Sequence, residues 1–272
     1  MRTLKIQNVT IGKNHPLVLI SGPCVIESEN FALDTAKHLK DLALELNIPF
    51  IYKASYDKAN RSSYSSFRGP GLIEGLKILE KVKTKLSIPV ISDVHTVEEV
   101  DAAKEVLDIL QIPAFLCRQT DLVTACAKTG CALNVKKGQF LAPWDMKNVI
   151  DKIESCGNHN ILLTERGYTF GYNNLVADMR SIPIMQSLGY PVCFDGTHSV
   201  QLPGGLGTSS GGQREMIPTL SKSATAAGCD VIFLESHPDP SKAKSDAASV
   251  MDFKDLKSLI QKLQKIHSIV IE

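Results

Sequence analysis

No apolar run in the sequence approaches the length of about eighteen residues that a membrane-spanning helix needs. Residues 1–15 alternate polar and apolar side chains, whereas a secretory signal peptide has a continuous apolar centre. We therefore expect a cytoplasmic protein that makes no contact with a membrane.

The sequence also lacks an excess of charge of either sign. Lysine and arginine number 30 and aspartate and glutamate number 29, which gives a formal net charge of +1. A chain without a strong overall field does not recruit nucleic acid through its net charge. We expect no nucleic-acid partner, and a site for an anion must be a local cluster of basic residues.

Motifs for disulfides and nucleotides are missing as well. The seven cysteines are odd in number and form no CxxC pair, which fits a reducing compartment better than a disulfide framework. There is no GxxxxGKS or GxxxxGKT phosphate loop, and no G-x-G-x-x-G follows an N-terminal strand pattern. The glycine-rich segment 201–215 instead predicts a mobile loop that closes over a site. These absences argue against a nucleotide cofactor.

Eight short apolar segments are present, and helical spacing of apolar residues lies between them, as in residues 31–47 and 97–107. They begin about thirty residues apart, the length of a βαβ unit, and their continuous apolar character indicates strands buried on both faces. The pattern predicts a (β/α)₈ barrel, with an open doubly wound sheet as the alternative. The predicted strands are 17–21, 49–55, 89–93, 108–112, 132–137, 161–165, 191–195 and 230–236.

The segment before the first predicted barrel strand has a different pattern. Residues 1–16 show strand alternation around a polar GKNH turn and no helical spacing, so we expect a hairpin that caps the barrel floor. No linker or low-complexity tract divides the chain, which predicts one barrel domain over residues 1–272.

Polar residues stand at the end of nearly every predicted strand, where the chemistry of such barrels collects. Lysine and arginine are rarely buried without a partner, so three basic residues that converge on one barrel mouth predict bound anions. Ordinary surface ion pairs are the alternative. The strand-end residues are Cys24, Lys53, Asp93, Gln111, Lys136, Glu165, Arg166, Asp195, His198 and Glu235.

The loop after the second predicted strand carries unbalanced positive charge. Residues 53–71 contain four cations and only one carboxylate, Asp57. Lys58 and Arg61 are accompanied by Asn60 and Ser62, a mixture of charged and neutral donors that suits phosphate oxygens and sugar hydroxyls. The loop therefore predicts a small phosphorylated substrate. Arg68, beside the GPG turn, is expected to pair or cap outside the site.

A second set of residues has the chemistry of metal ligands. A thiolate, an imidazole and two carboxylates, from Cys24, His198, Glu235 and Asp246, can bind Zn²⁺, Fe²⁺ or Mn²⁺. Their wide separation along the chain makes the spacing alone a weak signal. A buried cysteine that acts as a small hydrophobic residue and a histidine that caps a loop are the alternatives.

Six sequence blocks together resemble one family, 3-deoxy-D-manno-octulosonate 8-phosphate synthase, over nearly the whole chain. The resemblance implies a homotetrameric (β/α)₈ barrel that condenses phosphoenolpyruvate with D-arabinose 5-phosphate and releases inorganic phosphate, for lipopolysaccharide synthesis. The blocks are KANRSS (58–63), IPAFLCRQTDL (112–122), NVKKGQFLAPWD (134–145), TERGYTFGYNNLVADMRS (164–181), DGTHSVQLPGG (195–205) and ESHPDP (235–240).

The same resemblance implies roles for individual residues. The phosphate and carboxylate of phosphoenolpyruvate are expected on Lys53, Lys58, Lys136 and Arg166. The sugar phosphate is expected on Asn60, Arg61, Ser62 and, across a subunit boundary, Arg118. Further contacts are expected from Gln111, from Asp93 and Gln201 near the sugar chain, and from His198.

The residue at position 24 divides that family into two classes. Members that work without a metal have asparagine in this block, whereas this sequence has SGPCVIES. The resemblance therefore implies the metal-dependent class, with a divalent transition metal on Cys24, His198, Glu235 and Asp246.

Three alternatives stay open at this stage. A Schiff base through Lys53 or Lys136 competes with purely electrostatic catalysis, although lysines crowded by anions should stay protonated. A 3-deoxy-D-arabino-heptulosonate 7-phosphate synthase would use erythrose 4-phosphate, but such enzymes have a KPRTS-like block where this chain has KANRSS. A non-catalytic sugar-phosphate sensor on the same barrel is the third.

Overall fold

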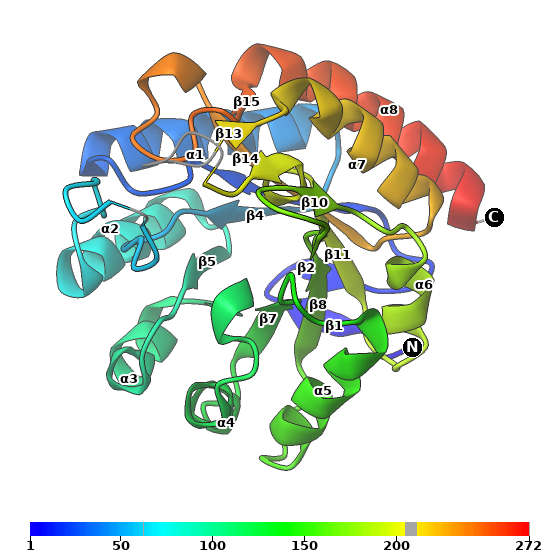
Figure 1. The fold of residues 1–272 in the computed structure, drawn as a ribbon. Helices are drawn as coiled ribbons and strands as arrows, with labels where there is room; N and C mark the ends of the chain where they lie inside the picture. Colours follow the sequence, from blue (N-terminus) through cyan, green and yellow to red (C-terminus); the bar gives the residue numbers. More distant parts are fainter. Residues whose placement is uncertain (62, 205–210, 272) are drawn as a thin grey trace.

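The computed structural model describes residues 1–61, 63–204 and 211–271. Eight parallel strands close into a barrel because β14 pairs with both β3 and β11, and helices surround the ring (Figure 1). Each strand overlaps a predicted segment, so the barrel is confirmed and the open sheet is wrong. In pairing order the strands are β3 (Val18–Gly22), β4 (Phe50–Lys53), β5 (Val90–Asp93), β6 (Ile109–Ile112), β7 (Ala132–Lys136), β8 (Ile161–Glu165), β11 (Val192–Asp195) and β14 (Val231–His237).

The outer helices pack apolar stripes on the barrel. In α1 the buried residues Ala32, Ala36, Leu39 and Ala43 follow helical spacing, and the Ser28 hydroxyl caps the helix by accepting the Phe31 N–H. No helix in the described part of the chain has the length and apolar character of a membrane span. The helices are α1 (Glu29–Glu45), α2 (Leu72–Leu86), α3 (Val97–Val106), α4 (Thr120–Lys128), α5 (Met146–Glu154), α6 (Ser181–Gln186), α7 (Ile217–Ala226) and α8 (Phe253–Ile271).

Short elements form in the connecting segments. Two of the strands, β12 and β13, pair with each other at the two ends of the glycine-rich segment, whose residues 205–210 lie outside the described residues. The short strands are β9 (Tyr168–Thr169), β10 (Leu175–Val176), β12 (Gln201–Leu202), β13 (Gly211–Gly212) and β15 (Met251–Asp252). The 3₁₀ turns are η1 (Ala114–Leu116), η2 (Pro143–Asp145), η3 (His198–Val200), η4 (Arg214–Met216) and η5 (Pro240–Lys242).

The N-terminal hairpin covers the barrel floor. Strands β1 (Leu4–Ile6) and β2 (Val9–Ile11) pair antiparallel, and their buried side chains share one apolar cluster with the barrel interior. Figure 1 shows the hairpin, in blue, within the ring of strands. The predicted hairpin is confirmed, and it packs against the end of the barrel opposite the polar strand ends.

Strand alternation explains how the fold delivers polar groups to one place. The barrel interior holds a layer of apolar side chains that includes Ile51, Ile91, Ile109, Leu162 and Phe233. Alternate residues of a strand face the same side, so the residue two positions later also points inward, one layer closer to the mouth. In seven of the strands that next residue is polar: Lys53, Asp93, Gln111, Asn134, Thr164, Asp195 and Glu235.

Candidate active site

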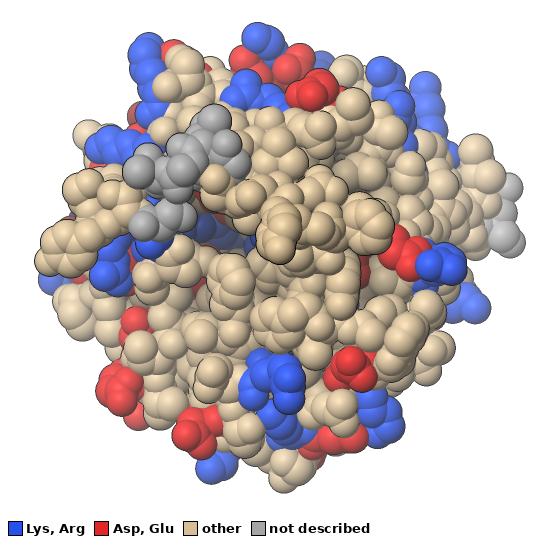
Figure 2. All heavy atoms as spheres, in the orientation of Figure 1, with Lys and Arg blue, Asp and Glu red and all other residues tan. Residues whose placement is uncertain are grey.

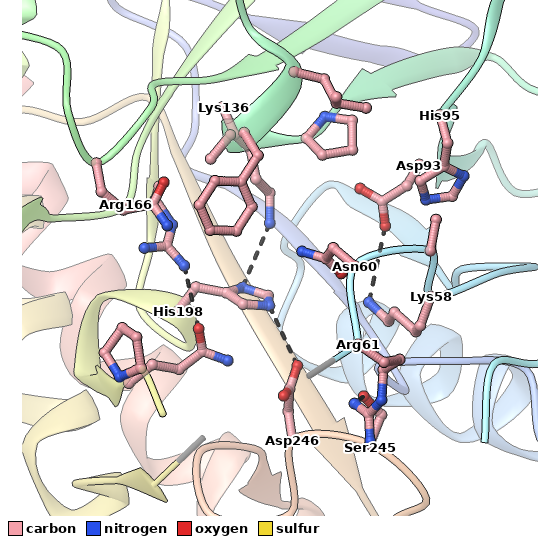
Figure 3. Close-up of a pocket in the computed structure, with 18 of the residues that line it drawn as sticks. Lys58, Asn60, Arg61, Asp93, His95, Lys136, Arg166, His198, Ser245 and Asp246 are labelled. Atoms are coloured by element: carbon pink, nitrogen blue, oxygen red, sulfur yellow. Dashed lines mark hydrogen bonds and ion pairs between the residues drawn. The ribbon is translucent and has the colours of Figure 1, made fainter. Parts of the chain in front are cut away.

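A cavity of about 700 Å³ opens at the carboxyl ends of the barrel strands. Figure 2 shows this face hollowed left of its centre, with basic side chains visible inside the hollow. In Figure 3, Lys58 points into the cavity from the loop after β4, and Lys136 and Arg166 point into it from the ends of β7 and β8. The polar residues that line it include Lys58, Asn60, Arg61, Asp93, His95, Lys136, Gln139, Arg166, His198, Gln201, Ser245 and Asp246.

Arg166 is a buried guanidinium with unused donors. Its side chain follows β8 and is 5% exposed, and Nη2 donates to Gln201 Oε1 at 3.2 Å. Nε and Nη1 have no hydrogen-bond partner among the described residues, and neither has the nearby Gln139 Oε1. Burial lowers the pKa of Arg166, while nearby carboxylates such as Asp195 raise it. A desolvated cation with free N–H groups is suited to hold a bidentate anion.

Lys136 lies across the cavity from the loop after β4. Its Nζ donates to Asp195 Oδ2 at 2.7 Å, is 3.4 Å from His198 Nδ1, and sits 4.1 Å from the centroid of the Phe233 ring. His198 Nδ1 in turn lies 2.7 Å from Asp195 Oδ2. Asp195 therefore holds both a cation and an imidazole at the cavity wall.

Lys58 is the third cation of the cavity. Its Nζ lies 3.8 Å from Asp93 Oδ2 and 3.8 Å from Glu235 Oε1. Burial alone would lower the pKa of Lys58, but the carboxylates around it, Glu235, Asp93 and Asp246, raise the pKa well above its ordinary value. The ammonium group therefore stays protonated at neutral pH.

Lys53 occupies a different place from the other predicted cations. It is 1% exposed, does not line the cavity, and donates to Glu235 Oε1 at 2.5 Å and to the Cys24 carbonyl at 2.8 Å. The backbones of β3 and β4 also approach closely at this point, because a Cβ on Gly22 would lie 1.9 Å from the Lys53 carbonyl oxygen. Lys53 thus neutralises a buried carboxylate beneath the cavity. The predicted convergence on one mouth holds for Lys136 and Arg166, which Lys58 joins, and is wrong for Lys53. The partners of the three cavity cations are buried, not the surface ion pairs of the alternative.

Asp93 reaches the cavity with both oxygens engaged. Gln111 Nε2 donates to Oδ1 at 2.7 Å, and Ser55 Oγ donates to Oδ2 at 2.5 Å. Burial alone would raise the pKa of Asp93, but Lys58, Lys53 and Lys136 hold it below its ordinary range. Gln111, an expected substrate contact, is fully buried behind Asp93 and does not line the cavity.

The loop after β4 supplies the predicted phosphate-binding residues that can be placed. Asn60 and Arg61 line the cavity, and Arg61 Nη1 donates to Ser245 Oγ at 2.6 Å. Ser62 lies outside the described residues. Arg68 pairs with Asp57 away from the cavity, with Nε 2.8 Å from Oδ1, as the sequence predicts.

Arg118 does not reach the cavity of its own chain. It follows η1, is exposed, and its carbonyl accepts from Lys152 Nζ at 3.1 Å. This position is compatible with a contact to another subunit, which is where the resemblance puts it.

The residues expected to bind a metal meet next to the cavity. Cys24, Glu235 and Asp246 each offer an atom within 4.8 Å of the others, and His198 Nε2, outside that closest group, is 3.7 Å from both carboxylates. Glu235 Oε2 is buried without a partner in the described part of the chain. A soft sulfur, an imidazole and an orphaned carboxylate oxygen fit a borderline cation.

The protonation of this group depends on its burial. Burial, together with Asp246 and Glu235, raises the pKa of the Cys24 thiol, which donates to Asp246 Oδ2 at 3.2 Å. Burial would also raise the pKa of Glu235, but Lys53, His198 and Lys58 lower it to about 2. A cation would have to displace the thiol proton, because thiolate is the form that ligates metals.

Several residues that line the cavity, or that hydrogen-bond to the residues lining it, were not predicted from the sequence. His95 and Gln139 line the cavity, and Ser245 holds Arg61. These three lie in irregular segments beyond the strands, where no periodicity marks which way a side chain points. Asn134 and Thr164 lie on β7 and β8, and the two-residue alternation from Ala132 and Leu162 was a usable signal for both.

The sequence and this site can be compared with known proteins. Residues 2–272 match the model of the DAHP synthetase I family. The chain belongs to this family. This member of the DAHP synthetase I family is also similar to curated relatives that carry a more specific name.

Three such relatives are called 2-dehydro-3-deoxyphosphooctonate aldolase, another name for the octulosonate phosphate synthases. The protein of Protochlamydia amoebophila is 60% identical over 270 residues, which cover 99% of this chain and 98% of the relative. Those of Geobacter metallireducens and Geobacter sulfurreducens are 61% and 59% identical over 269 residues, covering 99% of both chains in each case. These matches confirm the resemblance seen in the sequence blocks.

Proposed function

We propose that this chain condenses phosphoenolpyruvate with D-arabinose 5-phosphate and water to give 3-deoxy-D-manno-octulosonate 8-phosphate and inorganic phosphate. The observation that carries the proposal is Arg166, whose buried Nε and Nη1 have no partner among the residues that the structure describes and which shares a cavity with Lys58 and Lys136. Relatives about 60% identical are named for this chemistry. Their names favour the octulosonate reaction over the heptulosonate reaction. The product is a lipopolysaccharide precursor, and seven free cysteines support a cytoplasmic location.

In this reaction the methylene carbon of phosphoenolpyruvate bonds to the aldehyde carbon of the sugar. Water adds to the carbon that bears the phosphate ester, and the C–O bond to phosphate then breaks. Both substrates are anions and repel each other in water. Lys58, Lys136 and Arg166 offset that repulsion and orient phosphoenolpyruvate, while Arg61 and Asn60 hold the sugar phosphate and Asp93 and Gln201 its hydroxyl groups.

The electrostatic role of the lysines is favoured over a Schiff base. A Schiff base needs a neutral amine. Lys53 is ion-paired with Glu235 at 2.5 Å beneath the cavity, and Lys136 is ion-paired with Asp195 at 2.7 Å at the cavity wall. Each lysine already serves as the cationic partner of a buried carboxylate, which supports the electrostatic role.

The proposal includes a divalent transition metal, Zn²⁺, Fe²⁺ or Mn²⁺, held by Cys24, His198, Glu235 and Asp246. The donor set and the orphaned Glu235 oxygen support it. When bound, such an ion supplies a Lewis acid beside the aldehyde. His198 is fixed at Nδ1 by Asp195, so its Nε2 is the nitrogen left to face Glu235 and Asp246.

A phosphate-release assay tests the proposed function. We expect stoichiometric release of inorganic phosphate with both phosphoenolpyruvate and arabinose 5-phosphate, and a product of the mass of the eight-carbon acid phosphate. Phosphoenolpyruvate alone is the control and should give none. Faster turnover with erythrose 4-phosphate would establish the heptulosonate reaction instead, and binding of both substrates without any release would establish a sensor.

The proposal also includes a homotetramer. Aromatic side chains are exposed on the segments after β6, β7 and β8, and contact with further subunits would cover them. Arg118 follows η1 on the same segment as one of them, Phe115. The exposed aromatic residues are Phe115, Phe140, Trp144, Tyr168, Phe170 and Tyr172.

Mixing two inactive variants tests whether Arg118 serves a neighbour. Arg118→Ala and Lys58→Ala subunits should each have low activity, and co-expressed mixtures should recover about a quarter of the wild-type activity, because random assembly leaves that share of sites with both residues intact. Activity is measured by phosphate release after mixed tetramers are verified by native mass spectrometry. Mixed tetramers that stay as inactive as the parents would exclude a shared site.

A further inference from the structure

Four buried side chains form a hydrogen-bonded line that ends on Asp93. Thr164 Oγ1 donates to Asn134 Oδ1 at 2.5 Å, and Asn134 Nδ2 donates to Gln111 Oε1 at 2.8 Å. Gln111 Nε2 then donates to Asp93 Oδ1 at 2.7 Å. Thr164, Asn134 and Gln111 have no exposed surface, and they come from the adjacent strands β8, β7 and β6.

The line has a fixed direction. A side-chain amide has one acceptor oxygen and one donor nitrogen, so the acceptor-only Asp93 sets the orientation of Gln111, and Gln111 sets that of Asn134. The Thr164 hydroxyl donates to the Asn134 oxygen that remains at the far end. The last member is a carboxylate, which only accepts when ionised. If Gln111 turned over, its oxygen would face the Asp93 carboxylate and its amide N–H groups would face those of Asn134. If Asn134 turned over, its oxygen would face the Gln111 oxygen. A fully satisfied buried network of this kind rigidifies its members.

The barrel register places the line where it can act on the cavity. Asp93 is paired with Gln111, and Gln111 with Asn134, across neighbouring strands. These residues form the first polar layer above the apolar interior. Of the line, only Asp93 lines the cavity, where its Oδ2 accepts from Ser55 and lies 3.8 Å from Lys58 Nζ.

We propose that Thr164 and Asn134 are positioning residues, which act through Gln111 to hold Asp93 at the angle where it accepts a sugar hydroxyl beside Lys58. The inference rests on the proposed function and extends it to residues that touch no substrate. It assigns the line to recognition of the aldose phosphate. Of the three cations assigned to phosphoenolpyruvate, only Lys58 lies beside Asp93, whereas Arg166 and Lys136 have other partners, so binding of phosphoenolpyruvate is expected to depend less on the line.

The test compares Thr164→Val, which keeps the shape and removes the hydroxyl, with Thr164→Ser, which keeps the hydroxyl. Without the hydroxyl, the buried Asn134 Oδ1 loses its donor, and the amide is held in the line only by its bond to Gln111. We expect kcat/KM for arabinose 5-phosphate to fall about tenfold in Thr164→Val, mainly through KM, and to stay within about twofold of wild type in Thr164→Ser. The KM for phosphoenolpyruvate should change less than about twofold in both.

A double-mutant cycle tests the route through Gln111. In a Gln111→Leu background the line is already cut, so Thr164→Val should have little additional effect on kcat/KM. A full tenfold loss in that background would overturn the proposal. So would a Thr164→Val enzyme that loses kcat with unchanged KM for both substrates, since that is the result of a merely structural role.

Other outcomes separate this inference from the proposed function. If the wild-type protein releases phosphate and Thr164→Val has the same kinetic constants for arabinose 5-phosphate, the inference alone is overturned. A wild-type protein that releases no phosphate overturns the proposed function and the inference with it. Should Thr164→Val fail to fold, Asn134→Asp serves in its place, because a carboxylate cannot donate to Gln111 and the same rise in KM for the aldose phosphate is expected.

Discussion

Arg166→Gln should lower kcat/KM for phosphoenolpyruvate by about a thousandfold, because the change removes a buried cation aimed at an anionic substrate. The wild-type guanidinium has two N–H groups without a partner among the described residues, so a bound anion satisfies it and an empty cavity does not. Steady-state phosphate release at varied phosphoenolpyruvate measures the effect.

Two variants control for charge and for fold. Arg166→Lys keeps the charge without the planar fork, and should recover only part of the lost activity. Arg68→Gln removes a cation from the same end of the barrel that is already paired with Asp57 outside the cavity, and should leave kcat/KM unchanged. If Arg166→Gln binds phosphoenolpyruvate as tightly as the wild type by calorimetry, Arg166 is not the anion site.

Chelation should abolish at least about 99% of the activity, and one of Mn²⁺, Zn²⁺ or Fe²⁺ should restore it. The reason is the donor set of Cys24, Glu235 and Asp246 within 4.8 Å, with His198 beside them. Metal content by mass spectrometry and phosphate release are measured on the same samples. A protein that carries no metal and keeps full activity after chelation would exclude the metal-dependent class and leave the condensation itself standing.

Variants at position 24 separate the thiolate from the fold. Cys24→Ser and Cys24→Asn should retain little metal after dialysis, because the soft ligand is lost, and Cys24→Asn should also lose activity in this background. The matched control is Cys126→Ser, a change at another fully buried cysteine, on α4 and outside the cavity. Equal metal loss in Cys126→Ser would attribute the effect to disturbed packing.

The sequence predicted the barrel well because its strands are apolar, short and regularly spaced. The polar residues after them, such as Asp93 and Glu235, could be assigned to one mouth because parallel strands share a carboxyl end. Lys136 and Lys137 show that strand alternation distinguishes even neighbouring residues. Lys136 faces the cavity, whereas its neighbour Lys137 is buried outside it, 3.6 Å from Glu165 Oε2, as strand alternation requires.

The partners of these groups could not be predicted. Lys53 and Glu235 are 182 residues apart in the chain and meet only because β14 lies next to β3, which in turn pairs with β4. The line from Thr164 to Asp93 likewise depends on the stagger of four strands, which no local pattern encodes. Sequence periodicity gives the side of the strand on which a residue lies, whereas the shear of the closed barrel decides which residue it meets.

The apolar interior that Ile51, Ile109 and the hairpin residue Ile11 build has an electrical consequence. The ionised groups above it rest on a medium of low polarisability, not on water, so the field of each lysine or carboxylate decays slowly beneath the cavity. Dissolved salt screens charges on the outer surface, but it does not enter this layer. The hairpin therefore helps to keep water and salt away from the lower side of these charges. As a result, the attraction between the barrel charges and a bound anion depends little on the ionic strength outside.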